Sequence, residues 1–256
     1  MRAAISALLL IPVAALAASA FDGTWKTNLD SMKVSGKPDV YLLADGQYSC
    51  LSCFPPLEVK ADGAEHKVSG HAYYDTATVR VLSPNAIETT LKQGGKVFAT
   101  ITETVSTDGQ TLNTKFVNHA GAKEVVGHAT SKRVANGPAG SHVISGSWQQ
   151  DRLQGGDVMR TVQYEMTDDS FKYHWNGQSY DAKFDGKEYP VRGDSGHTTV
   201  TLKKIDSNTV EETDHRQGKV VNVTRLAAAP EGKTIAVTEN DVAHGQTTSY
   251  TLDKQP

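Results

Sequence analysis

The chain has 256 residues, of which 38% are hydrophobic, 21% charged and 7% aromatic, a composition typical of a globular protein rather than a disordered or fibrous one. It carries 26 lysines and arginines against 29 aspartates and glutamates, giving a formal net charge of -3. No segment has the dense basic stripe that binding to a phosphate backbone requires, which argues against nucleic acid as a partner. The length allows one large domain or two small ones.

The first twenty residues have the three parts of a secretory signal peptide. Arg2 gives a charged start, residues 3–16 form an apolar run, and residues 18–20 are a small-residue cleavage site. The run is interrupted by Pro12 and is shorter than the roughly 18 apolar residues of a transmembrane helix. We therefore expect cleavage near Ala20, no membrane span, and a protein that is periplasmic or secreted.

The sequence repeats itself at a constant offset. Gly23-Thr24-Trp25 recurs as Gly146-Ser147-Trp148, and 148 minus 25 gives an offset of 123 residues. The same offset aligns further pairs, namely Tyr41 with Tyr164, Asp62 with Asp185, Glu88 with Glu211, Gly95 with Gly218, and Gly109 with Gly232. This pattern predicts two domains, residues 21–133 and residues 146–256, joined by a turn-rich linker at residues 134–145. A single large barrel assembled from both halves is the alternative.

Each copy is predicted to be a run of short antiparallel strands. Segments rich in valine and threonine alternate with period two, and Asp-Gly and related dipeptides between them suit tight hairpin turns. In the first copy the strands begin at Thr24, Val40, Leu57, Lys67, Thr76, Ala86, Lys96, Thr111 and Lys123. Closing such a meander removes its unpaired edges, so the sequence predicts an all-β fold of two tandem up-and-down barrels, each of about eight or nine strands.

The Gly-x-Trp motif before a meander with Asp-Gly turns resembles the lipocalin and fatty-acid-binding protein superfamily, the calycins, here as a tandem-duplicated, bacterial lipocalin-like protein. The resemblance implies that each tryptophan closes the base of a barrel beneath a basic side chain from the end of that barrel. The candidates are Lys132 or Arg133 over Trp25 in the first copy, and Lys254 over Trp148 in the second. Such a cation–π contact is worth on the order of 0.5 to 2 kcal/mol. The resemblance also implies binding or carriage of a small hydrophobic molecule.

Two cysteines, Cys50 and Cys53, occur in the first copy and have no counterpart in the second. In an oxidising compartment such a pair forms a disulfide, although its short loop limits the stabilisation to about 2 kcal/mol. In the alternative, the two sulfurs combine with His66 and His71 to form a tetrahedral zinc site.

Known catalytic motifs are missing from the sequence: it has no Gly-x-Ser-x-Gly, His-Glu-x-x-His or glycine-rich phosphate loop. The expectation is a protein that binds or carries a small hydrophobic ligand without catalysis and without a cofactor. Two alternatives stay open: a metal-dependent or thiol-dependent activity at Cys50, Cys53, His66 and His71, and a structural envelope module that contacts another protein. The volume and polarity of each barrel interior discriminate between these hypotheses.

Overall fold

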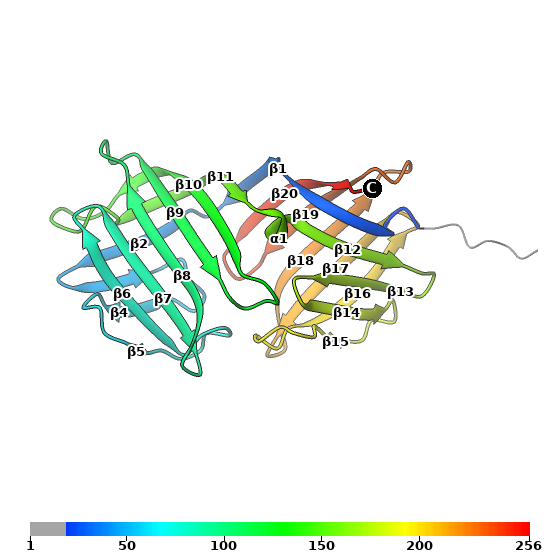
Figure 1. The fold of residues 1–256 in the computed structure, drawn as a ribbon, viewed down its shortest axis with the longest axis horizontal. Coiled ribbons are helices and arrows are strands. Elements are labelled where there is room, and N and C mark those ends of the chain that lie inside the picture. Colours follow the sequence, from blue (N-terminus) through cyan, green and yellow to red (C-terminus); the bar gives the residue numbers. More distant parts are fainter. Residues whose placement is uncertain (1–18) are drawn as a thin grey trace, which may run out of the picture.

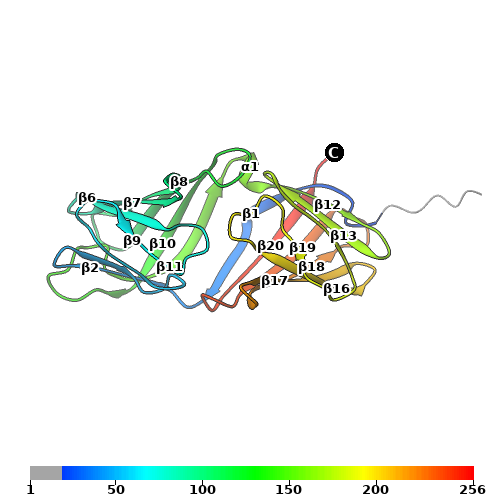
Figure 2. The same cartoon turned by 90° about the horizontal axis from the view of Figure 1, so that it is seen from below.

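The structure, a computed structural model, describes residues 19–256, and all but the last two residues of the predicted signal peptide lie outside this part. The chain forms two antiparallel sheets of ten strands each, and each sheet curls into a nearly closed barrel. The two barrels lie side by side along the long axis of the molecule (Figures 1 and 2). The prediction of two all-β barrels is confirmed. Within residues 19–256, no helix has the length and apolar character that crossing a bilayer would need.

One barrel, which we call the N-terminal barrel, has the strand order β4-β3-β2-β11-β10-β9-β8-β7-β6-β5. Its strands are β2 (Asp39–Ala44), β3 (Gln47–Cys50), β4 (Leu57–Lys60), β5 (His66–Lys67), β6 (Thr76–Ser83), β7 (Ala86–Gln93), β8 (Lys96–Val105), β9 (Thr111–Asn118), β10 (Val125–Asn136) and β11 (Gly146–Gly155). They form one contiguous stretch of chain, in which each strand pairs with its neighbour in sequence except at the closure between β2 and β11 and at the open edge between β4 and β5.

The other barrel, which we call the C-terminal barrel, has the strand order β14-β13-β12-β1-β20-β19-β18-β17-β16-β15. Its strands are β1 (Gly23–Gly36), β12 (Thr161–Met166), β13 (Ser170–Trp175), β14 (Gln178–Lys183), β15 (Tyr189–Pro190), β16 (Thr199–Asp206), β17 (Thr209–Arg216), β18 (Lys219–Ala228), β19 (Thr234–Asp241) and β20 (Gln246–Lys254). A four-residue helix, α1 (Asp157–Arg160), connects β11 to β12.

The predicted duplication is present in the strands themselves. Strands β5 to β9 begin and end 123 residues before β15 to β19, as 199 minus 76 shows for β6 and β16. Each barrel has ten strands rather than eight or nine, because the four-residue strand β3 follows the Asp45-Gly46 turn, where the sequence pattern did not predict a strand. The other nine strands of the first copy begin within two residues of their predicted positions.

The first strand of each copy lies in the barrel formed by the other copy. Strand β1 pairs with β12 and β20, whereas β11 pairs with β10 and β2; Figure 1 shows β1, in blue, among the strands of the C-terminal barrel. This corrects the predicted boundaries: residues 39–155 form one barrel, and residues 23–36 with 161–254 form the other. The predicted linker at 134–145 contains the end of β10 and the turn to β11, because short connections keep consecutive strands paired.

The base of each barrel is closed by the tryptophan of a Gly-x-Trp motif. Trp25 and Trp148 are 0% exposed. Trp25 donates a hydrogen bond from Nε1 to the carbonyl oxygen of Phe21 at 2.7 Å, and Trp148 donates to that of Ile144 at 2.9 Å. Since 144 minus 21 is also 123, the repeat preserves the acceptor as well as the donor. These residues anchor one hydrophobic core in each barrel.

A basic side chain lies over each of these tryptophans, and it comes from the copy that did not supply the ring. The Arg133 guanidinium is 3.9 Å from the centroid of Trp148, and the Lys254 ammonium is 5.3 Å from that of Trp25. The predicted pairing of Arg133 with Trp25 and of Lys254 with Trp148 is therefore exchanged, as the strand exchange requires. Lys132 instead lies 3.9 Å from Asp151.

The motif glycines and the residues before them complete the base. Gly23 and Gly146 have φ angles of 125° and 133°, which L side chains rarely adopt. The side chain before each glycine accepts a backbone hydrogen bond from the neighbouring strand. Asp22 accepts from the N–H of Met166 at 2.8 Å, and the equivalent Ser145 accepts from that of Leu43 at 2.9 Å.

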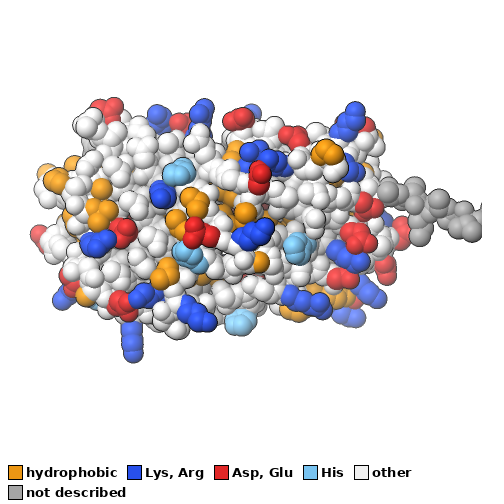
Figure 3. All heavy atoms as spheres, viewed as in Figure 1, with side chains coloured by type: hydrophobic (Ala, Val, Ile, Leu, Met, Phe, Trp, Pro, Cys, Tyr) orange, Lys and Arg blue, Asp and Glu red, His pale blue; other side chains and the backbone are white. Residues whose placement is uncertain are grey.

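The outer surface carries interspersed acidic and basic side chains on the face in Figure 3.

Candidate functional site

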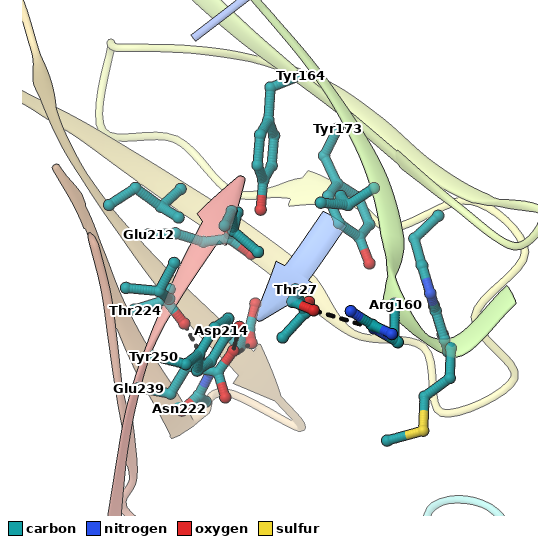
Figure 4. Close-up of a pocket in the computed structure, with 16 residues that line it drawn as sticks. Thr27, Arg160, Tyr164, Tyr173, Glu212, Asp214, Asn222, Thr224, Glu239 and Tyr250 are labelled. Atoms are coloured by element: carbon teal, nitrogen blue, oxygen red, sulfur yellow. Dashed lines mark hydrogen bonds between the residues drawn. The ribbon is translucent and has the colours of Figure 1, made fainter. Parts of the chain in front are cut away.

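The interior of the C-terminal barrel holds a polar cavity of about 320 Å³ (Figure 4). Its lining comes from β1, β12, β13, β17, β18, β19, β20 and α1, so nearly every strand around the barrel contributes a side chain. The volume equals that of about ten water molecules at about 30 Å³ each. It lies at the lower end of the range of small-molecule sites, about 300 to 1,000 Å³.

One wall of the cavity carries three carboxyl groups. Glu212 and Asp214 are two residues apart on β17 and so point to the same side of the sheet, and Glu239 joins them from β19. Each accepts a hydrogen bond from a neutral donor. The Tyr180 hydroxyl donates to Glu212 at 2.5 Å, the Tyr250 hydroxyl to Glu239 at 2.5 Å, and the Asn222 amide to Asp214 at 3.3 Å.

Burial changes the protonation of this wall. Desolvation raises the pKa of Glu212 well above its usual value, and the neighbouring charge of Asp214 raises it further. Desolvation also raises the pKa of Asp214 and of Glu239. Buried carboxyls without a partner of opposite charge hold their protons, because the charged form is the one that burial penalises. The protonated carboxyls of this wall are neutral, and a positive charge placed beside them would favour their ionised form.

The opposite wall presents tyrosine hydroxyls. Tyr164 on β12 and Tyr173 on β13 point their hydroxyls into the cavity (Figure 4), and neither hydroxyl has a hydrogen-bond partner within residues 19–256. Their ring centroids lie 6.1 Å apart, and Tyr173 stacks on Tyr180 at 5.2 Å. Neither hydroxyl is among the buried side-chain atoms without a partner, so both are accessible from the cavity, where a ligand or water can hydrogen-bond to them.

Helix α1 lines one end of the cavity with Met159 and Arg160. Arg160 donates from Nε to the carbonyl oxygen of Thr27 at 3.0 Å, and the indole of Trp175 donates to the carbonyl oxygen of Val158 at 3.1 Å. Arg160 is the one basic side chain among the lining residues that the structure describes. In Figure 4 it lies across the cavity from the carboxyl wall.

A second cavity of about 300 Å³ lies behind the carboxyl wall and shares Asp214, Asn222 and Glu239 with the first. Its lining includes His244 of the C-terminal barrel and Phe54 of the N-terminal barrel. The carboxyl wall therefore separates the barrel interior from a pocket at the boundary between the two barrels.

The residue before Phe54 belongs to the disulfide loop. Cys50 and Cys53 form the disulfide, and the backbone N–H of Cys53 also contacts the Cys50 sulfur at 3.1 Å. This bridge closes the loop after β3 in the N-terminal barrel. The loop thus carries the 57% exposed Phe54 side chain to the boundary pocket.

The interior of the N-terminal barrel is filled at the positions that are polar in the C-terminal barrel. Up to β19, subtracting 123 gives the equivalent pairs Glu212 and Thr89, Asp214 and Leu91, Glu239 and Phe116, and Tyr180 and Leu57. In β20 the offset is 121, since Arg133 pairs with Trp148 as Lys254 pairs with Trp25, so Tyr250 is equivalent to Ala129. A Cβ at Gly127 would overlap the ring of Phe116, so this glycine is what allows the aromatic ring to occupy the space. Leu57 and Leu91 belong to the hydrophobic core of this barrel.

One acid is buried in the N-terminal barrel at a position that is apolar in the other. Glu103 is 4% exposed, and its equivalent in the C-terminal barrel is Leu226. Burial, with a smaller contribution from the charge of Asp39, raises the pKa of Glu103 to about 7.

The zinc site considered from the sequence is not formed. Cys50 and Cys53 are bonded to each other, His66 contacts Asp62 at 2.8 Å, and His71 stacks on a tyrosine at 4.3 Å. Within residues 19–256, no group of three or more histidine, cysteine, aspartate or glutamate side chains is arranged to hold a metal ion. Sulfur atoms joined in a disulfide do not supply the thiolates that zinc requires.

The carboxyl and tyrosine walls were not among the sequence candidates. The signal that could have found them is a comparison of the two copies at inward-facing strand positions, where acids replace a threonine, a leucine and a phenylalanine.

No known protein family, curated protein or solved structure matches this chain. The calycin resemblance of the two Gly-x-Trp motifs therefore stays a prediction. The cavity of the C-terminal barrel is the feature from which a function is inferred.

Proposed function

We propose that this chain is an exported, non-catalytic small-molecule-binding protein whose ligand occupies the interior of the C-terminal barrel. The observation that carries the proposal is the polar cavity of about 320 Å³ in one barrel, where three acids stand at positions that are threonine, leucine and phenylalanine in the other. Two copies of one fold with equally packed interiors would suggest a structural module, whereas a single opened interior indicates a specialised site.

The lining favours an amphipathic ligand over the purely hydrophobic one predicted from the family resemblance. An apolar molecule would leave the hydroxyls of Tyr164 and Tyr173 without partners, at about 1 to 3 kcal/mol for each buried polar group. A ligand with its own hydrogen-bonding groups would satisfy them. The rings of Trp175 and the two tyrosines provide an apolar surface for the rest of the molecule.

Kinship with the calycins and export to the periplasm or the medium are parts of the same proposal. The buried Gly-x-Trp tryptophans with a cation over each ring support the kinship. The disulfide between Cys50 and Cys53 is compatible with an oxidising compartment, and the charged start, apolar run and small-residue site of the first twenty residues support export.

The test is native mass spectrometry of the protein purified from its own cells, combined with thermal-shift screening of small amphipathic compounds. We expect a bound molecule, or compounds that raise the melting temperature. Tyr164→Phe should weaken binding, whereas the matched change Tyr41→Phe in the N-terminal barrel should not. The pair Glu239→Phe with Thr248→Gly reproduces in the C-terminal barrel the Phe116 and Gly127 pair of the N-terminal one, and it should abolish binding in a folded protein. The proposal fails if no compound binds, or if this filled variant binds as the original does.

A further inference from the structure

We propose that the ligand is a small organic cation, an amine of about ten non-hydrogen atoms with an apolar body, whose ammonium group lies against Glu212, Asp214 and Glu239. This inference rests on the proposed function and specifies the ligand of the same cavity. Its basis is the distribution of donors, acceptors and charge around the cavity.

The carboxyl wall has more acceptor capacity than its neighbours use. Tyr180, Asn222 and Tyr250 donate to one oxygen of Glu212, Asp214 and Glu239 respectively, and all three donors are neutral. A carboxyl group has two acceptor oxygens, and an ammonium group has three donors and a positive charge. An amine therefore supplies the donors and the charge that the wall lacks.

Basic side chains near the cavity are engaged elsewhere. Arg160 donates from Nε to the carbonyl oxygen of Thr27 at 3.0 Å and lies across the cavity from the wall. Arg216 lies 4.7 Å from the Tyr73 ring centroid and donates from Nε to Thr198 at 2.9 Å. Arg216 still acts on Asp214 through its charge and lowers the pKa of that carboxyl, whereas no basic side chain within residues 19–256 hydrogen-bonds to Glu212 or Glu239 in place of the neutral tyrosines.

Two further acids near the wall raise the pKa of its carboxyls. Asp194, from the loop after β15, and Asp241, on β19, both act on these carboxyls through their charge. Asp241 is paired with His244 at 2.6 Å. These charges disfavour ionisation of the wall in the free protein, and an ammonium group placed beside the wall would offset them.

The arrangement fits an organic cation rather than a metal ion. No group of three or more acidic, histidine or cysteine side chains within residues 19–256 is arranged to coordinate one ion. The cavity has room for about ten water molecules, far more than a bare ion fills. Tyr164, Tyr173 and Trp175 also line the cavity and provide aromatic faces against which an apolar body packs.

Binding of an amine should release protons. The pKa values of Glu212, Asp214 and Glu239 are raised by burial, so the free protein holds protons that an ammonium ion displaces. Affinity for an amine should therefore rise as pH rises through the range in which these carboxyls are protonated in the free protein. For a neutral ligand, affinity should fall as pH rises or should not change with pH.

The experiment is isothermal titration calorimetry of the signal-peptide-free protein with 2-phenylethylamine, 2-phenylethanol and phenylacetate. These probes share a phenyl ring and differ in charge. We expect the amine to bind at least about tenfold more tightly than the alcohol, the anion to bind most weakly, and buffers of different ionisation enthalpy to reveal proton release on amine binding.

Two variants give the matched comparison. Glu239→Gln keeps an acceptor for Tyr250 but removes a charge, so it should reduce the preference for the amine over the alcohol. Glu103→Gln removes a buried carboxyl from the other barrel and should leave that preference unchanged. Binding of the alcohol as tightly as the amine overturns the cationic ligand but leaves the proposed function standing. If the amine does not bind, the cationic ligand is also overturned. If none of the three probes binds and neither native mass spectrometry nor thermal shift finds a ligand, the cationic ligand and the proposed binding function are both overturned.

Discussion

The two barrels share one scaffold and differ in what fills it. Strands β5 to β9 and β15 to β19 have the same lengths and spacing, and both barrels close on a buried tryptophan beneath a basic side chain. Inside, Leu91 belongs to the hydrophobic core of the N-terminal barrel, whereas the equivalent Asp214 borders a cavity in the C-terminal one. The base and the strands therefore specify the fold, while a few inward-facing positions decide whether an interior is packed or open.

The hairpin after the third strand also differs between the copies. In the N-terminal barrel Cys50 and Cys53 close it with a disulfide. The equivalent residues in the C-terminal barrel, 123 positions later, are Tyr173, which lines the cavity, and Asn176, which contacts the N-terminal barrel. The same hairpin thus carries a disulfide in one copy, whereas in the other it lines the cavity and contacts the neighbouring barrel.

The largest effect is expected when the base of one barrel is removed. Trp25→Ala deletes a fully buried indole and should destabilise the protein by about 3 to 5 kcal/mol, measured by urea unfolding. Because β1 lies in the C-terminal barrel, amide hydrogen exchange should show lost protection in β16 to β19 and not in β6 to β9. Trp148→Ala is the matched variant and should show the reverse. Loss of protection in β6 to β9 on changing Trp25 would contradict the exchanged pairing.

Glu103 should make the N-terminal barrel less stable as pH rises. Its pKa is about 7 in the folded chain against an ordinary value of 4.5, so the folded state binds the extra proton between these values and stability falls as pH rises through this range. The shift corresponds to about 3 kcal/mol between pH 4 and pH 8. Glu103→Leu places there the residue that the C-terminal barrel has at position 226.

We expect Glu103→Leu to be more stable than the parent protein at pH 8 by more than it is at pH 4, in urea unfolding at both values. Part of the pH dependence should remain, since Glu212, Asp214 and Glu239 titrate in the same direction. A difference between variant and parent that stays constant with pH would show that Glu103 is not a buried, protonated acid.

The disulfide should contribute less to the stability of the folded protein than Trp25 or the protonation of Glu103. Replacing Cys50 and Cys53 together by serine should lower stability by about 2 kcal/mol, because the bridge closes a very short loop. The loss should be confined to the N-terminal barrel in hydrogen exchange, and reductant should reproduce it in the parent protein and have no effect on the variant. A loss of protection that begins in β16 to β19 would contradict this assignment.

Local signals in the sequence predicted most of the strands but not their partners. Alternation and Asp-Gly turns placed nine strands of the first copy within two residues of their starts, because period two and positive φ are properties of the local chain. The four-residue strand β3 was missed, although β4, which has the same length, was predicted. The exchange of β1 and β11 depends on the barrel with which each strand pairs. That is a long-range property, and both strands begin with the same Gly-x-Trp motif, so the motif does not predict it.

The candidate site was harder to predict than the fold. An inward-facing glutamate such as Glu212 has the same strand pattern as an exposed acid, since alternation reveals which residues share a face but not which face is inside. The disulfide followed from the two cysteines alone. The cation over each tryptophan was expected from the family resemblance, and only the exchange of its partner was missed.

The smallest effect is expected at the contact between the barrels, where Asn176 replaces the second cysteine. Its Nδ2 donates to the carbonyl oxygen of Lys123 at 2.8 Å, its Oδ1 accepts from the Lys123 N–H at 2.8 Å, and its backbone oxygen accepts from Ala122 at 2.7 Å. Asn176→Ala removes the first two bonds and keeps the third. We expect a loss of about 1 kcal/mol, because these side-chain bonds are partly exposed to water.

Small-angle scattering and hydrogen exchange of the Asn176→Ala variant locate that loss. The β9–β10 loop at residues 119–124 should exchange faster, while the strands of both barrels keep their protection. Asn176 has a positive φ of 44°, which asparagine tolerates better than alanine, so Asn176→Gly is the control that removes the same bonds without backbone strain. Equal loop exchange in both variants would assign the effect to the hydrogen bonds, whereas an unchanged loop in the glycine variant would show that these bonds do not hold the barrels together.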